Sequence, residues 1–219
     1  MSSIADNIRQ TKASLPDDVT LVAVSKFKSC DDIMEAYGAG QRVFGESRAL
    51  ELRDKHEALP KDIQWHFIGH LQTNKIKYII PFVTLIHSID SLKLLEEVDA
   101  QARNHGRSVD CLLQVHISQE ETKFGFTYDE CRAVLKELAD APLANVNVVG
   151  LMGMATYTDD MDVVRNEFAG LKAFFEEARA MMPQRLSVLS MGMSEDYEVA
   201  VQEGTTMVRI GSKIFGLRN

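Results

Sequence analysis

Cysteine is scarce in this sequence. The three cysteines, an odd number, are widely separated: Cys30, Cys111 and Cys131. They form neither a CxxC pair nor a disulfide framework, so we expect reduced thiols in a reducing compartment, the cytoplasm. The sequence also lacks an apolar run long enough to span a bilayer. Its opening stretch, MSSIADNIRQTKASLP, resembles neither a signal peptide nor a transit peptide.

Clusters of basic residues are missing as well. The 219 residues carry a formal net charge of −8, which disfavours nucleic acid or an anionic membrane surface as the main partner. A small anionic ligand stays compatible with this balance, because local dipoles can hold it. Apolar residues make up 45% and prolines number only five, so we expect a compact chain. Without a linker or a long apolar stripe, we predict a single domain over residues 1–219 and a monomer.

Short apolar runs alternate with helical patterns along the chain. The predicted strands are Thr20–Ser25, Arg42–Gly45, Gln64–Ile68, Thr84–Ser88, Val109–Ile117, Val146–Met152, Arg185–Ser190 and Met207–Ile210. The predicted helices are Asp31–Tyr37, Arg48–Ala58, Thr73–Ile79, Ser91–Asn104, Thr127–Ala139, Asp162–Met181 and Glu195–Gln202. Capping signals mark two of these starts, a serine at Ser91 and a Thr-x-x-Glu box at Thr127. Ile4, Ile8 and Leu15 suggest a further, amphipathic helix at the start.

Repeated strand–helix units imply parallel strands with helical crossovers, the α/β class. Eight units fit a single closed (β/α)8 barrel of the TIM type with an extra N-terminal helix. A doubly wound sheet would give a similar pattern. The count of eight, and the lack of a GxGxxG motif after the first strand, favour the barrel.

The first strand runs directly into a lysine in the stretch TLVAVSKFKS, residues 20–29. Val22, Val24 and Lys26 share one face of this strand. If that face lines the barrel, the Lys26 amine stands at the C-terminal rim, where such barrels keep functional groups. Partial burial would lower the pKa of the amine, as an imine-forming lysine needs. The alternative is a strand-end lysine that reaches into water, which we expect of Lys28.

Glycines and hydroxyls dominate the ends of the last two strands, SMGMS at 190–194 and RIGS at 209–212. Barrels of this type commonly bind phosphate after strands seven and eight. Ser194 opens a predicted helix whose free N–H groups suit an anion. Gly211 allows close approach of the backbone, and Ser212 can donate a hydrogen bond. Either loop alone could be a simple turn, but two on adjacent strands favour a phosphate site.

Arg209 is predicted to point into the barrel, since it shares a face with Met207 and Gly211. Closure of strand eight on strand one would make it a neighbour of Lys26. A buried guanidinium needs an acceptor, so two alternatives stand level: an ion pair with Glu46, or an atom of a ligand. An imine-forming amine, a phosphate cradle and an inward cation together describe a site for pyridoxal 5′-phosphate.

Motifs spread over nearly the whole chain carry a resemblance to a known family. They are AVSK at 23–26, FGESRALE at 44–51, WHFIGHLQTNK at 65–75, HSIDS at 87–91, K-x-G at 123–125, GLMGMA at 150–155 and LSMGMSEDYEVAVQEGTTMVRIGSKIFG at 189–216. In order and spacing they resemble the pyridoxal phosphate homeostasis proteins. These are single-domain relatives of the barrel domain of bacterial alanine racemase.

The resemblance implies a site for pyridoxal 5′-phosphate in which Lys26 forms a Schiff base with the cofactor. It also implies that Ser194, Gly211 and Ser212 hold the phosphate and that Arg209 faces the ring nitrogen. These residues would bind the cofactor, and we assign no catalytic residue.

Further contacts are expected around the cofactor. His66 would line its edge from the third strand, and Met193 would pack beneath the ring with neighbouring methionines. Ser47 would contact it from the second-strand loop. The family usually has asparagine at position 47 and glutamine in place of Leu50, so that contact differs from the usual one. We expect no metal, because His66 and His70 straddle a strand end and lack the helical spacing of a zinc motif.

The same features bear on activity. A guanidinium opposite the ring nitrogen keeps it unprotonated and weakens the electron sink, which disfavours transaminase-type chemistry. Racemisation needs a base on each face, and the related racemase takes one from a tyrosine of an additional domain. Here the sequence ends at Asn219, nine residues after Ile210, and no tyrosine stands at an obvious strand end.

We therefore predict a cofactor carrier of intracellular pyridoxal phosphate homeostasis with little or no turnover. Its candidate recipients are apo forms of pyridoxal phosphate-dependent enzymes. Two alternatives remain: an amino-acid racemase, whose weak activity this pattern leaves open, and a cofactor-free Schiff-base lyase or isomerase.

Overall fold

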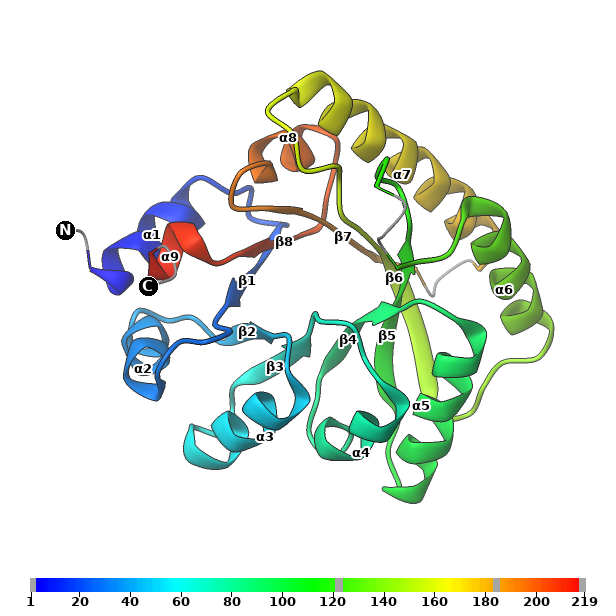
Figure 1. Ribbon diagram of the computed structural model, residues 1–219, viewed down its shortest axis with the longest axis horizontal. Helices are drawn as coiled ribbons and strands as arrows, with labels where there is room; N and C mark the ends of the chain where they lie inside the picture. Colours follow the sequence, from blue (N-terminus) through cyan, green and yellow to red (C-terminus); the bar gives the residue numbers. More distant parts are fainter. Residues whose placement is uncertain (1–2, 121–123, 183–185, 217–219) are drawn as a thin grey trace.

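The computed structural model describes residues 3–120, 124–182 and 186–216. Parallel strands close into a barrel in sequence order, and β8 pairs with β1. Figure 1 shows the strands at the centre and the helices around them. The strands are β1 (Thr20–Val24), β2 (Val43–Glu46), β3 (Gln64–Phe67), β4 (Leu85–Ile89), β5 (Val109–Val115), β6 (Val146–Gly153), β7 (Val188–Met193) and β8 (Met207–Ile210). The predicted TIM-type barrel is confirmed, and a doubly wound sheet is ruled out.

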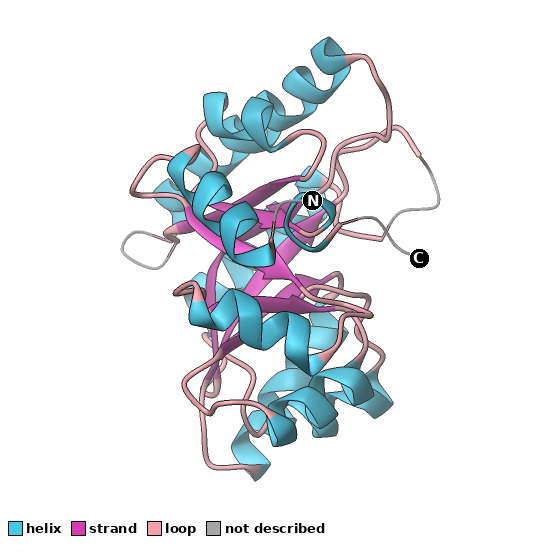
Figure 2. Ribbon diagram, turned by 90° about the vertical axis from the view of Figure 1, so that its left-hand side faces the viewer, coloured by secondary structure: helices cyan, strands magenta, loops and turns pink. Residues whose placement is uncertain are grey.

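Helices surround the strands, above and below them in the view of Figure 2. They are α1 (Ile4–Ala13), α2 (Cys30–Gly38), α3 (Ala49–Ala58), α4 (Ile76–Ile79), α5 (Leu92–Asn104), α6 (Tyr128–Asp140), α7 (Met161–Met181), α8 (Tyr197–Gln202) and α9 (Ser212–Phe215), with a 3-10 turn η1 at Thr73–Lys75. Among the described helices, none is long and apolar enough to cross a membrane.

Local signals in the sequence account for the helix starts. Thr127 and Glu130 form a capping box at α6, and Ser91 accepts a hydrogen bond from the Leu94 N–H at α5. Helix α1 is the predicted extra helix, and it packs against α9 (Figure 1). There Asn7 Nδ2 of α1 donates to the Ile214 carbonyl oxygen of α9 at 2.9 Å, so this hydrogen bond joins the first helix to the last.

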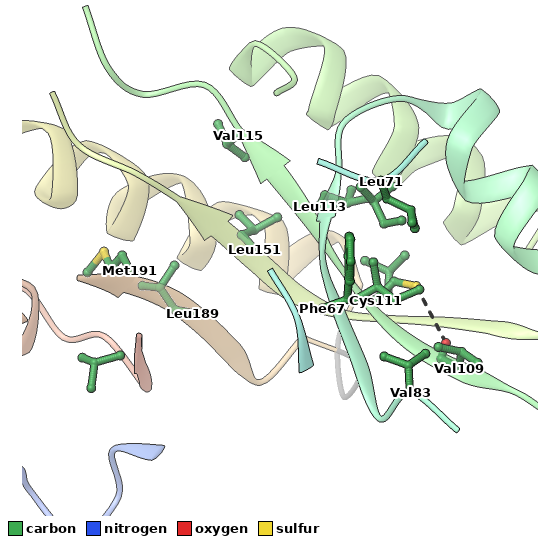
Figure 3. Packing of buried hydrophobic residues seen from close by; sticks show 14 of the residues in the cluster. Phe67, Leu71, Val83, Val109, Cys111, Leu113, Val115, Leu151, Leu189 and Met191 are labelled. Atoms are coloured by element: carbon green, nitrogen blue, oxygen red, sulfur yellow. Dashed lines mark hydrogen bonds between the residues drawn. The ribbon is translucent and has the colours of Figure 1, made fainter. Parts of the chain in front are cut away.

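Two apolar layers result from the alternation of side chains along the strands. Leu112 belongs to a small cluster inside the barrel with Val22 and Met152, whereas its neighbour Leu113 packs in the larger layer between strands and helices. Figure 3 shows part of this outer layer, including Phe67 and Leu113. The inner cluster fills the barrel and leaves polar groups to its C-terminal end.

The strand after α7 differs from the prediction. It was expected at Arg185–Ser190, whereas β7 spans Val188–Met193, and Arg185 lies outside the described residues. The strand continues past Ser190 because Gly192 adopts a φ of 94°, a backbone conformation that suits glycine. The register shifts between Ser190 and Met193, so the chain stays paired with β8 through a stretch that reads as a turn in sequence.

Candidate functional site

Lys26 lies half-buried in a tight turn at the C-terminal end of β1. The Lys28 N–H donates to the Ser25 carbonyl oxygen at 3.0 Å and closes the turn. Phe27 has a φ of 65°, a left-handed conformation that costs an ordinary residue about 1–2 kcal/mol. Its N–H donates to Glu51 Oε1 at 2.6 Å, so a side chain of α3 supports the strained residue.

Behind this turn lies a buried group that we call the Lys55 cluster: Ser25, Glu46, Glu51 and Lys55. Lys55 Nζ donates to the Ser25 carbonyl oxygen at 2.8 Å, to Glu46 Oε1 at 2.8 Å and to Glu51 Oε1 at 2.7 Å. The Ser25 hydroxyl donates to Glu46 Oε1 at 2.6 Å. Burial raises the pKa of Glu46, and the charge of Lys55 opposes this rise.

Arg209 points into the barrel, as predicted, and is paired in register with Val22 of β1. Its guanidinium donates from Nη1 to the carbonyl oxygen of Ser190 at 3.0 Å and to the Ser190 Oγ at 2.6 Å. Nη2 donates to the Gly153 carbonyl oxygen at 3.1 Å. Burial lowers the pKa of Arg209 to about 10, an effect that the charge of Asp196 opposes, so the group stays charged at neutral pH.

The proposed Arg209–Glu46 ion pair is wrong. Alternate residues of a strand face opposite sides, and Glu46 faces outward, toward α3, where Lys55 neutralises it. Arg209 faces inward and makes its three hydrogen bonds given above to neutral oxygens.

A chain of buried polar groups extends from Arg209 across the barrel. Ser190 Oγ lies 3.1 Å from His87 Nδ1, and His87 Nε2 lies 3.0 Å from His66 Nδ1. Burial lowers the pKa of His66 to about 3. It also holds the pKa of His87 well below its ordinary value, as do His66 and Arg209 to a smaller degree, so both rings are neutral. Because a guanidinium only donates, Ser190 Oγ accepts a hydrogen bond from Arg209, and its own hydroxyl can donate a hydrogen bond to His87 Nδ1.

The residues predicted to hold a phosphate lie together at the ends of β7 and β8. Ser194 and Ser212 line a hollow of about 390 Å³ with Lys213. Ser194 Oγ accepts from the Gly211 N–H at 3.2 Å. A Cβ at Gly211 would lie 3.2 Å from the Cβ and the carbonyl oxygen of Val24, so glycine allows β8 to end close against β1.

The predicted helix at Glu195–Gln202 begins later than expected. Ser194 lies in a turn, and Asp196 occupies the position before α8. The Met193 N–H donates to Asp196 Oδ1 at 2.5 Å, and this bond holds the turn. Ser194 therefore does not open the helix, and what it offers at the hollow is its hydroxyl.

Comparison with known proteins places this geometry in a family. The domain described as "Alanine racemase, N-terminal domain" matches residues 1–219. The pyridoxal phosphate homeostasis protein of Aquifex aeolicus is 40% identical over 199 residues, 90% of this chain and 86% of that protein. The human protein of the same name is 35% identical over 236 residues, 100% of this chain and 86% of that protein. The chain belongs to the pyridoxal phosphate homeostasis protein family.

Solved structures agree with this membership. PipY of Synechococcus elongatus, with pyridoxal phosphate bound, has a TM-score of 0.89 and 38% identity, and the match covers 98% of this chain and 100% of that one. Alanine racemase from E. faecalis has a TM-score of 0.73 at 15% identity, over 98% of this chain and 58% of that one, and shows the shared fold. The resemblance predicted from sequence motifs is confirmed.

Two more residues, Ser47 and Met193, were predicted to contact the cofactor. Ser47 and Leu50 line a cavity of about 940 Å³ formed by the loops after β1, β2 and β3. Neither Lys26 nor Arg209 lines that cavity, so it adjoins the predicted site without being its centre. The Met193 side chain sits at the rim, 37% exposed. The contacts of Ser47 and Met193 with the cofactor stay predictions.

Two further predictions concern Lys28 and metal binding. Lys28 does not extend into water, because its Nζ donates to the Phe215 carbonyl oxygen at 2.9 Å. It thereby ties the turn after β1 to α9. Among the described residues, no group of three or more His, Cys, Asp or Glu side chains is arranged to hold a metal ion.

Sequence reasoning missed several buried polar residues of the site. Lys55 reads as a surface lysine, yet Ala49, Leu52 and Lys55 form the buried face of α3 at helical spacing, a signal that could have found it. The alternation of strand residues could likewise have assigned His87 and Ser190 to the barrel interior. What no sequence pattern indicates is that their side chains meet, since they are 103 residues apart.

Proposed function

We propose that this protein binds pyridoxal 5′-phosphate as a Schiff base on Lys26 and serves as a carrier in pyridoxal phosphate homeostasis. The observation that carries the proposal is that a half-buried Lys26 follows β1 and that the adjacent strand β8 carries the charged, inward Arg209, in a chain of this family. The names of its relatives and the cofactor bound to PipY support it. Pyridoxal phosphate supplies an electrophilic aldehyde that joins a primary amine.

The described side chains fit such a cofactor. Lys26 would hold the cofactor through its amine, which would condense with the aldehyde and release water. Ser194 and Ser212 line one hollow with Lys213, Glu195 and Glu198, and the two serine hydroxyls can donate to phosphate oxygens. Gly211 lets the end of β8 lie close against Val24 of β1.

We further propose that turnover is slow or absent. The Arg209 guanidinium can only donate, so a ring nitrogen that accepts from it stays unprotonated and draws electrons weakly. The positions of the tyrosines also support a carrier. Tyr37, Tyr78, Tyr128 and Tyr197 pack in the outer layer, and Tyr157 is 91% exposed. Four of the five tyrosines therefore lie outside the barrel interior, away from where a second base would stand.

The same proposal covers partners and location. Apo forms of pyridoxal phosphate-dependent enzymes are the recipients we propose, with the carrier acting as a monomer. The cytoplasm is the compartment we propose, because Cys30, Cys111 and Cys131 are free thiols.

A racemase is the second candidate, favoured by the match of the whole chain to the alanine racemase domain. Incubation of the cofactor-loaded protein with L-alanine in D₂O separates the two. A carrier leaves the α-hydrogen in place, whereas exchange at about one per second or faster is enzymatic turnover and contradicts the proposal.

Absorbance tests cofactor binding itself. Titration of the protein with pyridoxal phosphate should give the yellow imine band, and Lys26→Ala should abolish it. Lys93→Ala is the control, since it removes an exposed lysine amine of α5, away from this turn, and should keep the band. An unchanged band in Lys26→Ala would refute the assignment.

A further inference from the structure

Lys55 donates to three acceptors at once. Its Nζ lies within 2.8 Å of three acceptors, the Ser25 carbonyl oxygen, Glu46 Oε1 and Glu51 Oε1. An ammonium has three hydrogens, so each acceptor receives one and the nitrogen keeps no lone pair. Lys55 is therefore not a second amine that could attack an aldehyde, and its role lies in what it holds.

The Lys55 cluster holds the backbone on both sides of Lys26. The Ser25 carbonyl belongs to the peptide group that precedes the Lys26 Cα, and it accepts from Lys55 Nζ at 2.8 Å. The Phe27 N–H belongs to the peptide group that follows, and it donates to Glu51 Oε1 at 2.6 Å. Because these two peptide groups set the direction of the Cα–Cβ bond between them, the cluster sets where the Lys26 side chain leaves the backbone.

The conformation of the turn needs such support. Phe27 is the one non-glycine residue with a positive φ among residues 3–120, 124–182 and 186–216. A turn of this kind, with a positive φ at its third residue, usually has glycine there. Loss of the bond to Glu51 removes one support of this positive φ and favours rotation of Phe27 toward a negative φ. That rotation would turn the peptide group attached to Lys26.

We propose that Lys55, Glu46 and Glu51 are positioning residues for Lys26. They hold the turn in the conformation that presents the Lys26 amine to the aldehyde carbon of the cofactor. This inference rests on the proposed function. In this inference the Lys55 cluster determines how fast the imine forms. The initial binding of the phosphate and the ring depends instead on residues of β7 and β8.

Variants of Glu51 test this assignment. Glu51→Ala removes the acceptor of the Phe27 N–H, whereas Glu51→Gln keeps an oxygen that can accept it. Protein is mixed with increasing pyridoxal phosphate and quenched with borohydride, and the Lys26 adduct is quantified by mass. We expect Glu51→Ala to lower the limiting rate about tenfold to a hundredfold, because misplaced reacting groups lose rate on this scale. The half-saturating concentration should stay unchanged, and Glu51→Gln should react like the wild type.

Two more variants complete the design. Lys172 and Glu176 form an exposed ion pair at 2.7 Å, four residues apart on α7, so Glu176→Ala removes a similar pair far from the site and should keep the rate. Glu51→Asp keeps a carboxylate near Lys55, but its side chain is one methylene shorter and no longer reaches the Phe27 N–H. It should slow the limiting rate and carries the test if Glu51→Ala fails to fold.

The outcomes separate the inference from the proposed function. A folded Glu51→Ala or Glu51→Asp protein with the wild-type limiting rate would overturn the positioning role. So would a change confined to the half-saturating concentration. If the wild-type protein itself forms no Lys26 adduct, the proposed function fails first.

Discussion

Arg209 shows how a single buried charge shapes this site. Its guanidinium is 4% exposed and hydrogen-bonded to two carbonyl oxygens and one hydroxyl. The hydroxyl of Ser190 continues to the neutral rings of His87 and His66. Neutral acceptors therefore contact the guanidinium directly. The charge of the Asp196 carboxylate further favours the charged form of Arg209.

Loss of the Ser190 hydroxyl tests these contacts of Arg209. Ser190→Ala should lower the free energy of unfolding by about 1.5–3 kcal/mol, the usual range for a hydrogen bond to a charged group. Urea unfolding measures the change. Ser88 provides a matched control, since it is equally buried and its Oγ has no hydrogen-bond partner among the described residues. Ser88→Ala should be close to neutral, and equal losses in the two variants would contradict the account.

The neutral state of His66 predicts an acid-sensitive stability. The unfolded chain takes up a proton at its ordinary pKa of 6.5, whereas burial lowers the pKa in the folded protein to about 3. Between these values the unfolded state binds more protons, so His66 lowers the free energy of unfolding by up to about 1.4 kcal/mol per pH unit of acidification.

His66→Asn removes this proton uptake while its amide can replace the contact of Nδ1 with His87. We expect the variant to lose stability less steeply than the wild type between pH 6 and pH 4, about one proton less in slope. Urea midpoints at several pH values give both slopes. Parallel curves would mean that His66 is not buried in its neutral form.

At the scale of the elements, β6 approaches both of its neighbouring strands at Gly150. On the β5 side, the register shifts after the Cys111–Val148 pair, so that Leu112 pairs with Gly150. A Cβ at Gly150 would lie only 1.7 Å from the Val188 carbonyl oxygen. The strands approach this closely because position 150 carries no side chain.

Gly150→Ala should therefore disrupt the contact of β6 with β7, since backbone cannot move aside as a flexible side chain can. We expect a loss of about 3 kcal/mol or more in urea unfolding, at the upper end of overpacking effects. Gly38→Ala is the control, because a Cβ there meets nothing within 4 Å. That variant should be neutral or up to about 1 kcal/mol more stable. A well-folded, fully stable Gly150→Ala protein would show that the strands can separate at this point.

The elements also show what the sequence could predict. Apolar alternation and capping residues indicated the strands and the start of α6 at Thr127, because these signals are local. The ends of β7 and the start of α8 were misjudged, since a bulge at Gly192 and the Asp196 carboxylate decide them. The Lys55 cluster was missed because it depends on contacts between two strand ends and a helix.

For the whole molecule, closure of the barrel brings distant residues to one rim. Strand β8 lies beside β1, so Arg209 of β8 is next to the strand that leads into the Lys26 turn, although the two residues are near opposite ends of the sequence. The count of strand–helix units was enough to predict this neighbourhood, because a closed parallel barrel joins its last strand to its first. It could not predict which side chains satisfy Arg209, since that depends on packing inside the barrel.

The most direct test of the account is the chemical identity of the bound lysine. The protein is saturated with pyridoxal phosphate, reduced with borohydride, digested, and its peptides are identified by mass. The account predicts one pyridoxyl-phosphate adduct per chain, on Lys26, and none in Lys26→Ala. An adduct confined to another lysine, Lys55 or Lys213 included, would contradict it.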